Sequence, residues 1–222
     1  ENPFLNGLEK LASNHIYLIN DKNEKYEVSY IEGLNVIWLG ENSTITFYTN
    51  DIPQIINTTI RINSNSQITV GFNSNIKNLL VRMEQEESTI SIGNNFRIYQ
   101  GEFVITGSRG VKIQIGNDCL FSSHICLRAD DGHTIYDNKT NKILNHSKRI
   151  VIGNHVWLGN GVHILKNAVI SDNTIVGTKS IVIKPFEDTN TVIAGIPAKI
   201  VKKNINWDVR GLANFIGEYY EE

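Results

Sequence analysis

Residues 150–185 repeat with a period of six and read IVIGNH VWLGNG VHILKN AVISDN TIVGTK SIVIKP. A bulky aliphatic residue fills the third position of each hexapeptide, namely Ile152, Leu158, Ile164, Ile170, Val176 and Val182. A compact or β-branched residue opens most of them, namely Val156, Val162, Ala168, Thr174 and Ser180. This period matches neither an α-helix nor a lone strand, whose side chains recur every 3.6 and every two residues. It predicts short strands joined by sharp corners and stacked as a solenoid, with the aliphatic residues inside.

The corners and the flanking sequence fit the same scheme. Gly and Asn stand between the apolar positions, and both tolerate the left-handed backbone angles that sharp corners need. Upstream, the period of six recurs in two runs, Ile92, Ile98 and Val104, then Ile115, Phe121 and Leu127. The two runs differ by one residue in phase, which predicts a bulged corner at residues 108–110. Leu39 and Ile45 are also six apart, and we expect imperfect coils over roughly residues 30–90.

We therefore expect an all-β chain with three parts. Residues 31–205 form the solenoid, which a polar stretch at 128–149 interrupts. Residues 1–30 form an N-terminal cap segment with a short helix, because a bare end coil would expose an open sheet edge. Residues 206–222 form a helical tail, since the apolar residues after Asp208 recur at near-helical spacing.

Bulk properties exclude several classes of partner. The chain has 222 residues, 41% of them hydrophobic, and a net charge of −2, so neither nucleic acid nor a membrane surface is expected as a partner. No stretch reaches the roughly 20 apolar residues of a membrane span, and no leader opens the sequence, so we expect a cytoplasmic protein. Cys119 and Cys126 match neither a zinc pair nor a redox pair, and we expect buried, reduced thiols.

The interruption at residues 128–149 carries the candidate chemistry. It reads RADDGHTIYDNKTNKILNHSKR and is too polar and too long for a simple corner. Loops of this kind lie at the surface and often hold functional groups. It contains His133 directly after two aspartates and a glycine, and further on Tyr136 and His146.

Three segments around this loop resemble a known family. They are DDGHTIYD at 130–137, NHSKRIVIGNHVWLGNGVHILKNAVI at 145–170 and VIAGIPAKIVKKNINW at 192–207. They are similar to the hexapeptide-repeat O-acetyltransferases, and most of all to the bacterial capsular polysialic acid O-acetyltransferases. The resemblance implies a left-handed parallel β-helix, acetyl-CoA as donor, a carbohydrate acceptor, and a homotrimer with active sites between subunits.

The resemblance also implies catalytic roles. His133 would be the general base, and Trp157, which lies 24 residues later, would lie beside the reacting atoms. Histidine suits this role because its pKa lies near neutrality. The indole N–H of Trp157 would donate to the developing oxyanion, or its ring would line the pantetheine slot. Asp130 or Asp131 would orient the imidazole, although a solvated turn carboxylate fits either residue equally well.

Binding residues follow from the chemistry of this donor and acceptor, and Lys166 and Lys199 also match positions of the resembled family. Expected at the donor, besides Trp157, are Gly159, Asn160, Lys166, Thr178, Lys184 and Lys199. Expected at the acceptor are Arg128, Asp131, Tyr136 and His146. Arg128 would suit a sugar carboxylate such as that of sialic acid. A structural pairing of Arg128 with one of the two aspartates fits as well, and His146 would either touch the acceptor or support the loop.

Three other functions compete with O-acetyl transfer. A metal-dependent hexapeptide enzyme needs a histidine pair spaced HxxxxH, which none of the six histidines makes, so no metal is expected. An N-acetyltransferase acting on a nucleotide-linked amino sugar would keep the fold and the donor. A non-catalytic carbohydrate-binding solenoid would need neither His133 nor Trp157 nor the AGIPAK motif at 194–199, and all three are present.

Overall fold

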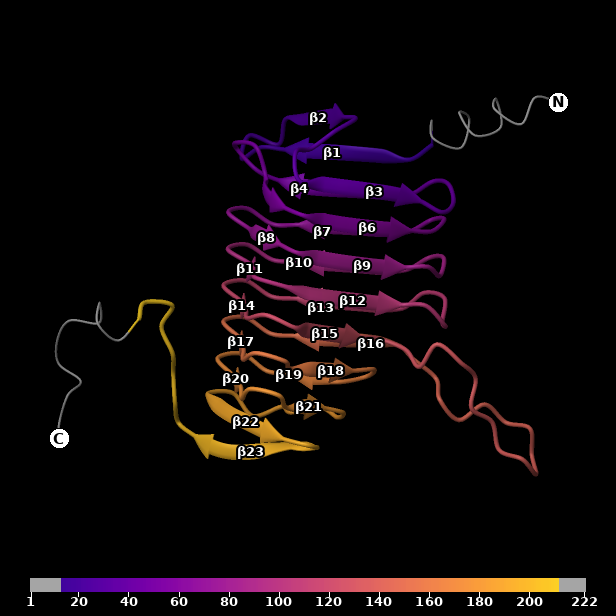
Figure 1. Ribbon diagram of the computed structural model, residues 1–222, viewed down its shortest axis with the longest axis vertical. Coiled ribbons are helices and arrows are strands. Elements are labelled where there is room, and N and C mark those ends of the chain that lie inside the picture. Colours follow the sequence, from indigo (N-terminus) through magenta and orange to yellow (C-terminus); the bar gives the residue numbers. More distant parts are fainter. Residues whose placement is uncertain (1–12, 212–222) are drawn as a thin grey trace.

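The computed structural model describes residues 13–211, which form a prism of stacked coils with one β-sheet on each of its three faces and no helix (Figure 1). Accordingly, this part of the chain contains no helix long and apolar enough to cross a membrane. Residues 15–19, which we assigned to the cap segment, already form a strand of the prism. Residues 1–12 of the expected cap and 212–222 of the expected helical tail lie outside the described residues.

Each face of the prism is one sheet, named A, B or C below. Sheet A contains β1 (His15–Ile19), β2 (Lys25–Val28), β4 (Thr44–Tyr48), β7 (Gln67–Val70), β10 (Thr89–Ile92), β13 (Lys112–Ile115), β16 (Arg149–Ile152) and β19 (Val169–Ile170). Sheet B contains β3 (Leu34–Trp38), β6 (Thr58–Ile62), β9 (Leu79–Met83), β12 (Gly101–Ile105), β15 (Ile125–Arg128), β18 (His163–Leu165) and β21 (Ile181–Val182).

Sheet C contains β5 (Gln54–Ile56), β8 (Asn75–Lys77), β11 (Arg97–Ile98), β14 (Leu120–Phe121), β17 (Trp157–Leu158), β20 (Ile175–Val176), β22 (Thr191–Gly195) and β23 (Ala198–Lys203). Neighbouring strands within a sheet are parallel except at the two ends of the prism. There β2 pairs antiparallel with β1, and β23 pairs antiparallel with β22. Each end therefore closes with a hairpin, which covers part of the open edge of the stack.

The core is a column of side chains along the prism axis. All six aliphatic residues of the 150–185 repeat are buried, and so are the five compact residues beside them. In the middle coils the column widens to accommodate aromatic rings, with Phe96 and Phe103 both edge-on to Phe121. Burying each such side chain contributes about 1.5–3 kcal/mol relative to exposure. The repeat pattern read from the sequence is thus confirmed as the core.

The corners rest on left-handed backbone and on stacked side-chain amides. Asn residues occupy corners with φ between 45° and 62°, a region that few other L-residues enter cheaply. At the corner after sheet A, the side-chain oxygen of Asn117 accepts a hydrogen bond from the backbone N–H of Asn94 at 2.8 Å. Asn154 and Asp172 continue this ladder in the next two coils. Each corner is therefore fixed by the coil that follows it.

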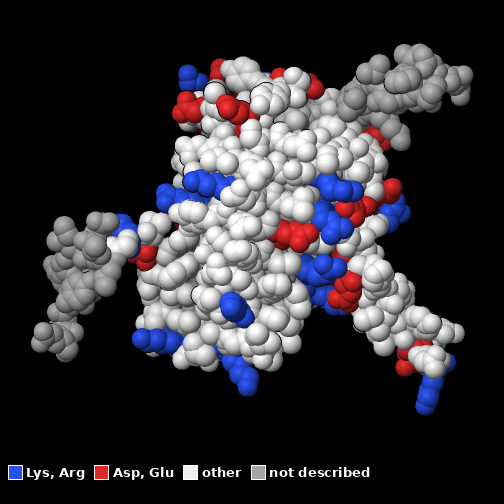
Figure 2. Space-filling model, viewed as in Figure 1, with Lys and Arg blue, Asp and Glu red and all other residues white. Residues whose placement is uncertain are grey.

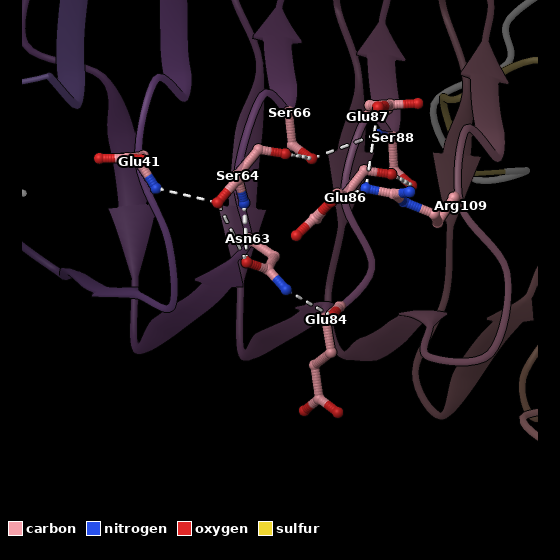
Figure 3. A network of polar contacts seen from close by, with 9 residues as sticks. All are labelled: Glu41, Asn63, Ser64, Ser66, Glu84, Glu86, Glu87, Ser88 and Arg109. Atoms are coloured by element: carbon pink, nitrogen blue, oxygen red, sulfur yellow. Dashed lines mark hydrogen bonds and ion pairs between the residues drawn. The ribbon is translucent and has the colours of Figure 1, made fainter.

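The corner between sheets B and A carries a second polar ladder (Figure 3). Asn63 donates from its amide to the carbonyl of Glu84 at 2.9 Å, and the backbone N–H of Ser88 donates to the Ser66 hydroxyl at 3.2 Å. Further along the same corner, Arg109 forms an ion pair with Glu86. One coil later, the 128–149 interruption leaves from this same corner.

Two register predictions need correction. Phe103 pairs with Val81 and Leu127 and is the inward residue of β12, whereas Val104 lies opposite Arg82 and Arg128. Phe103 follows the preceding inward residue, Ile98, by five positions instead of six, so the phase shift occurs between β11 and β12, before the predicted corner. Leu39, which we placed in register with Ile45, is 39% exposed because it lies past the end of β3.

Both cysteine thiols are free and Cys119 is buried, as expected, whereas Cys126, which we expected to be buried too, is only half-buried. Burial raises the pKa of Cys119 to about 12, and burial also raises the pKa of the half-buried Cys126.

Candidate active site

The interruption at 128–149 is an arm that leaves the prism between β15 and β16 and projects away from it (Figure 1). We call residues 129–148 the extruded loop. Its two branches run antiparallel, with a β-bridge between Tyr136 and Ile143. The backbone N–H of Leu144 donates to the carbonyl of Ile135 at 2.8 Å. The loop is thus internally paired as well as tied to the prism.

Asp130 fixes the first residues of the loop. It is only 1% exposed, and one carboxylate oxygen accepts the backbone N–H groups of Thr106 and Gly107 at 2.8 Å and of Ser108 at 3.2 Å. Its other oxygen accepts the N–H of Gly132 at 3.0 Å. These bonds occupy the carboxylate fully, so Asp130 anchors the loop to the corner one coil earlier.

Asp131 joins the two branches of the loop to the corner that follows β18. Its carboxylate forms an ion pair with Lys166 and accepts the side-chain amide of Asn145 at 2.8 Å. Lys166 also donates to the carbonyl of Asn145 at 3.2 Å, and Asn145 donates to the carbonyl of His133 at 2.7 Å. Asp131, Asn145 and Lys166 together are called the clamp below. The clamp fixes the backbone at His133.

The pKa of Asp131 reflects this environment. Burial by itself raises the pKa, but hydrogen bonds from Lys166 and Asn145 and the charges of Lys166 and Arg128 outweigh it. The net pKa therefore lies below its usual value, and the carboxylate is ionised at neutral pH. The ion pair between Asp131 and Lys166 is therefore formed at neutral pH.

His133 itself faces solvent on this fixed backbone. Among residues 13–211, its imidazole has no hydrogen-bond or ion-pair partner, so neither Asp130 nor Asp131 orients the ring within one chain. An accessible imidazole on a clamped backbone is available to take a proton from a bound substrate.

Trp157 lies on a different flank from His133. It points outward from β17 in sheet C and is 38% exposed, while Figure 1 shows the extruded loop leaving on the side away from β14, β17 and β20. One chain therefore does not bring His133 and Trp157 together. A site with both residues needs a second copy of the chain.

The chain after β23 returns along this flank and packs Trp207 beside Trp157. The two indole rings are tilted, with centroids 5.9 Å apart. Trp207 also stacks flat on His155 at 4.2 Å and donates from its indole N–H to the carbonyl of His155 at 2.9 Å. These contacts hold the Trp157 side of the site in place.

The predicted acceptor residues lie along the extruded loop. Arg128 stands at its start, where its charge lowers the pKa of Asp131 without an ion pair among the described residues. Tyr136 is 57% exposed in the outer part of the loop. The imidazole of His146 is exposed, and the carbonyl of His146 accepts the side-chain amide of Asn167 at 3.0 Å.

The predicted donor residues fall at separate places on the coil. Gly159, Asn160 and Thr178 lie at or next to the corner between sheets C and B, where a Cβ on Gly159 would stand 2.8 Å from the backbone nitrogen of Thr178. Lys166 and Lys184 lie at the corner between sheets B and A, and Lys199 lies on β23. A single chain therefore does not gather the predicted donor residues into one site.

Sequence reasoning missed two residues of this site. Asn145 contacts both branches of the loop, and its signal was its position in the NHSK segment shared with the resembled family. Trp207 ends the third resembling segment, but only the folded chain brings it to Trp157. Within residues 13–211, no group of three His, Cys, Asp or Glu side chains is arranged to hold a metal.

No family model matches the chain. A polysialic acid O-acetyltransferase of Neisseria meningitidis is 35% identical over 197 residues, which are 87% of this chain and 89% of that protein. A protein of the same name from Escherichia coli O1:K1 is 34% identical over 146 residues, which are 66% of this chain and 46% of that protein.

A solved structure extends the likeness to the whole prism. The polysialic acid O-acetyltransferase OatWY superposes with a TM-score of 0.72 and 28% identity, covering 91% of this chain and 90% of that one. The prism is therefore a left-handed parallel β-helix, as the resemblance implied. By its fold and its match to nearly the full length of a relative, the chain belongs to the hexapeptide-repeat O-acetyltransferases.

Proposed function

We propose that the protein transfers an acetyl group from acetyl-CoA to a hydroxyl of an anionic bacterial surface carbohydrate. Polysialic acid is the favoured acceptor, since relatives matching both most of the sequence and most of the fold carry that name. The reaction would take place in the cytoplasm, where acetyl-CoA is available.

His133 is the general base in this proposal. Its imidazole accepts the proton of the acceptor hydroxyl while the hydroxyl oxygen attacks the thioester carbonyl carbon. The C–S bond then breaks, and the imidazolium returns the proton to the departing CoA sulfur. No acyl-enzyme forms, so the chain needs no serine or cysteine nucleophile.

The clamp is the structural feature that best supports this proposal. Asp131, Asn145 and Lys166 fix the backbone of His133, yet they leave its imidazole free for a substrate. A loop with no catalytic role would gain little from such a support. Precise placement of a base matters because misplacement by about 1 Å can cost roughly 10²-fold in rate.

Trp157 from a neighbouring copy completes the site. Its separation from His133 within one chain supports a site between subunits, and a closed ring of three copies would form three such sites. The Trp157 indole N–H is then the candidate donor to the oxyanion that develops on the thioester oxygen. We therefore propose a homotrimer.

The donor-binding proposal rests on shape and charge. Gly159 is buried, and a Cβ there would stand 2.8 Å from the backbone nitrogen of Thr178, so the glycine lets the coils stack closely at the corner between sheets C and B. Asn160 and Thr178 are exposed at this corner, where their polar groups would contact an extended pantetheine chain. Lys199 is exposed and has no carboxylate partner among residues 13–211, which suits a phosphate of CoA. Lys184 would contact the same ligand from the corner of an adjacent copy.

The direct test is acetyl transfer to polysialic acid by the wild type and by His133→Ala. We expect kcat to fall by about 10²–10⁴-fold in the variant, the usual contribution of a general base. Stabilisation by CoA, measured as the shift in Tm, should be unchanged. His163→Ala, an exposed histidine on β18, is the matched control and should keep full activity.

Other outcomes would redirect the proposal. Equal activity of His133→Ala and the wild type would remove His133 from the mechanism. If CoA binds but no acidic or neutral sugar is acetylated, an amine acceptor on a nucleotide-linked sugar becomes the better assignment.

A further inference from the structure

The outer face of sheet C has a cavity of about 470 Å³ near its N-terminal end. Its floor is formed by outward-facing residues of β5, β8 and β11, and its wall by the segment 49–53 that precedes β5. The volume lies within the range of about 300–1,000 Å³ that is typical of small-ligand sites. Neither His133 nor Trp157 lines it, so it is separate from the site described above.

The strand register places this cavity in line with Trp157. Gln54 pairs with Asn75, Asn75 with Arg97, Arg97 with Leu120, and Leu120 with Trp157. Residues paired in parallel strands point to the same side of a sheet, so these five side chains form one outward row. Neighbouring strands are about 4.8 Å apart, which places Arg97 about 10 Å and Gln54 about 19 Å from Trp157 along the row.

Two cations in the cavity have no carboxylate partner among residues 13–211. They are Arg97, which is exposed, and Lys77, which is half-buried with its ammonium 5.7 Å from the ring centroid of Tyr99. Asp51 is the single carboxylate among the described residues that line the cavity. In Figure 2, Lys and Arg atoms gather on the flank that carries β8 and β11, without Asp or Glu atoms beside them.

The remaining lining suits a carbohydrate. Tyr99 is 54% exposed and offers an aromatic face with a polar tip. Asn75 and Gln54 hydrogen-bond each other at 2.8 Å and keep further donor and acceptor capacity toward the cavity. A second hollow of about 240 Å³ shares Arg97 with the first and extends along the same flank to Trp207. Asp118 and Asp208 line it, but Asp118 accepts the amide of Asn95 and Asp208 pairs with Arg210.

We infer that this groove is a second acceptor subsite, which binds the non-reacting part of an extended anionic polysaccharide while one sugar lies at Trp157. The inference rests on the proposed function for the identity of the acceptor. Arg97 and Lys77 contact carboxylates of successive sugars, and Tyr99 packs against a sugar ring. The subsite gives the enzyme a preference for long acceptors over short ones.

Direct binding tests the subsite without depending on catalysis. Titration of the full chain with long polysialic acid in the absence of acetyl-CoA should show binding that weakens with salt. Arg97→Gln and Lys77→Gln should each weaken it about tenfold, the typical loss for a hydrogen bond to a charged group. Lys112→Gln, an exposed lysine on β13 of sheet A, is the matched control and should bind like the wild type.

Kinetics then separate this inference from the proposed function. The variants should raise KM for the long polymer and leave kcat and KM for a sialic acid dimer unchanged. Unchanged binding in both variants, or failure of the wild type to bind the polymer, would overturn the subsite even if acetyl transfer occurs. Polymer binding that depends on Arg97 without any transfer would keep the subsite and overturn the proposed function. A changed oligomeric state in the variants would mark the groove as a subunit contact and also overturn the subsite.

Discussion

Two adjacent carboxylates in the extruded loop have different partners, and the sequence alone does not distinguish them. Asp130 is buried and accepts backbone N–H groups from the preceding coil. Asp131 is half-buried and pairs with Lys166 and Asn145. One holds the start of the loop against the prism, and the other ties its two branches together. Neither needs to touch the imidazole to position His133.

Substitution of Lys166 distinguishes a role of this residue in the clamp from a role in binding acetyl-CoA. If it acts through the clamp, Lys166→Met should lower kcat by about 10–100-fold through misplacement of His133 and leave KM for acetyl-CoA unchanged. Lys112→Gln serves again as the surface control. A rise in KM for acetyl-CoA at unchanged kcat would instead assign Lys166 to a phosphate of the donor.

The clamp also predicts a pH dependence. Because the folded pKa of Asp131 is depressed, its pairing stabilises the loop above the unfolded pKa of about 3.9 and is lost as pH falls through the lower folded pKa. The NMR signal of the Asn145 side-chain amide should stay constant from pH 7 to about 5 and shift below about pH 4. A transition well above pH 5 would contradict the depressed pKa.

At the residue level, the sequence drew attention to the exposed side chains of the candidate site and not to the residues that support them. His133 stood out because it lies in the interruption of the repeat and in a family motif, and Trp157 stood out through the family motif alone. Asn145 did not stand out, because its role depends on contacts with Asp131 and His133 across the loop. The spacing along the chain gives no direct sign of such contacts.

Among the elements, the extruded loop carries the proposed base, and its first residues are bonded to the corner one coil earlier. The extruded loop starts from a corner whose backbone N–H groups at residues 106–108 all donate to Asp130. A loop held in this way can project far from the prism and still present His133 at a defined place.

Removal of the anchor should therefore cost more than removal of a similar exposed residue. Asp130→Ala leaves buried N–H groups unsatisfied and should lower Tm by about 5–10 °C. Asp137→Ala is the control, because Asp137 also accepts backbone N–H groups, at 2.7 Å and 3.0 Å, but in the outer part of the loop where water can replace it. Its Tm should change by less than about 3 °C. Equal effects would show that Asp130 is not an anchor.

The elements could be predicted where the repeat is regular and not where corners vary. From residue 150 to residue 182 the inward positions were correct, because the coils there keep the same corner lengths. In the earlier coils a corner of different length moves the inward position of β12 from Val104 to Phe103. Both residues are apolar and buried, so composition cannot distinguish them.

In the whole molecule, the proposed site depends on assembly. His133 and Trp157 lie on different flanks of one prism, so the proposed chemistry requires two copies side by side. A ring of three equivalent interfaces is the simplest closed arrangement that uses the same pair of flanks each time. The sequence carried this information only through family resemblance, because no single-chain pattern encodes a contact between copies.

Mixed oligomers test this central claim. His133→Ala and Trp157→Ala are each expected to be inactive, so we would co-express them with different tags and purify oligomers that carry both. In a mixed trimer, one interface of three joins an intact His133 to an intact Trp157, which should restore about a third of wild-type activity. The double variant co-expressed with either single variant is the control and should stay inactive. Absence of any recovery in mixed oligomers of proven composition would contradict a site shared between copies.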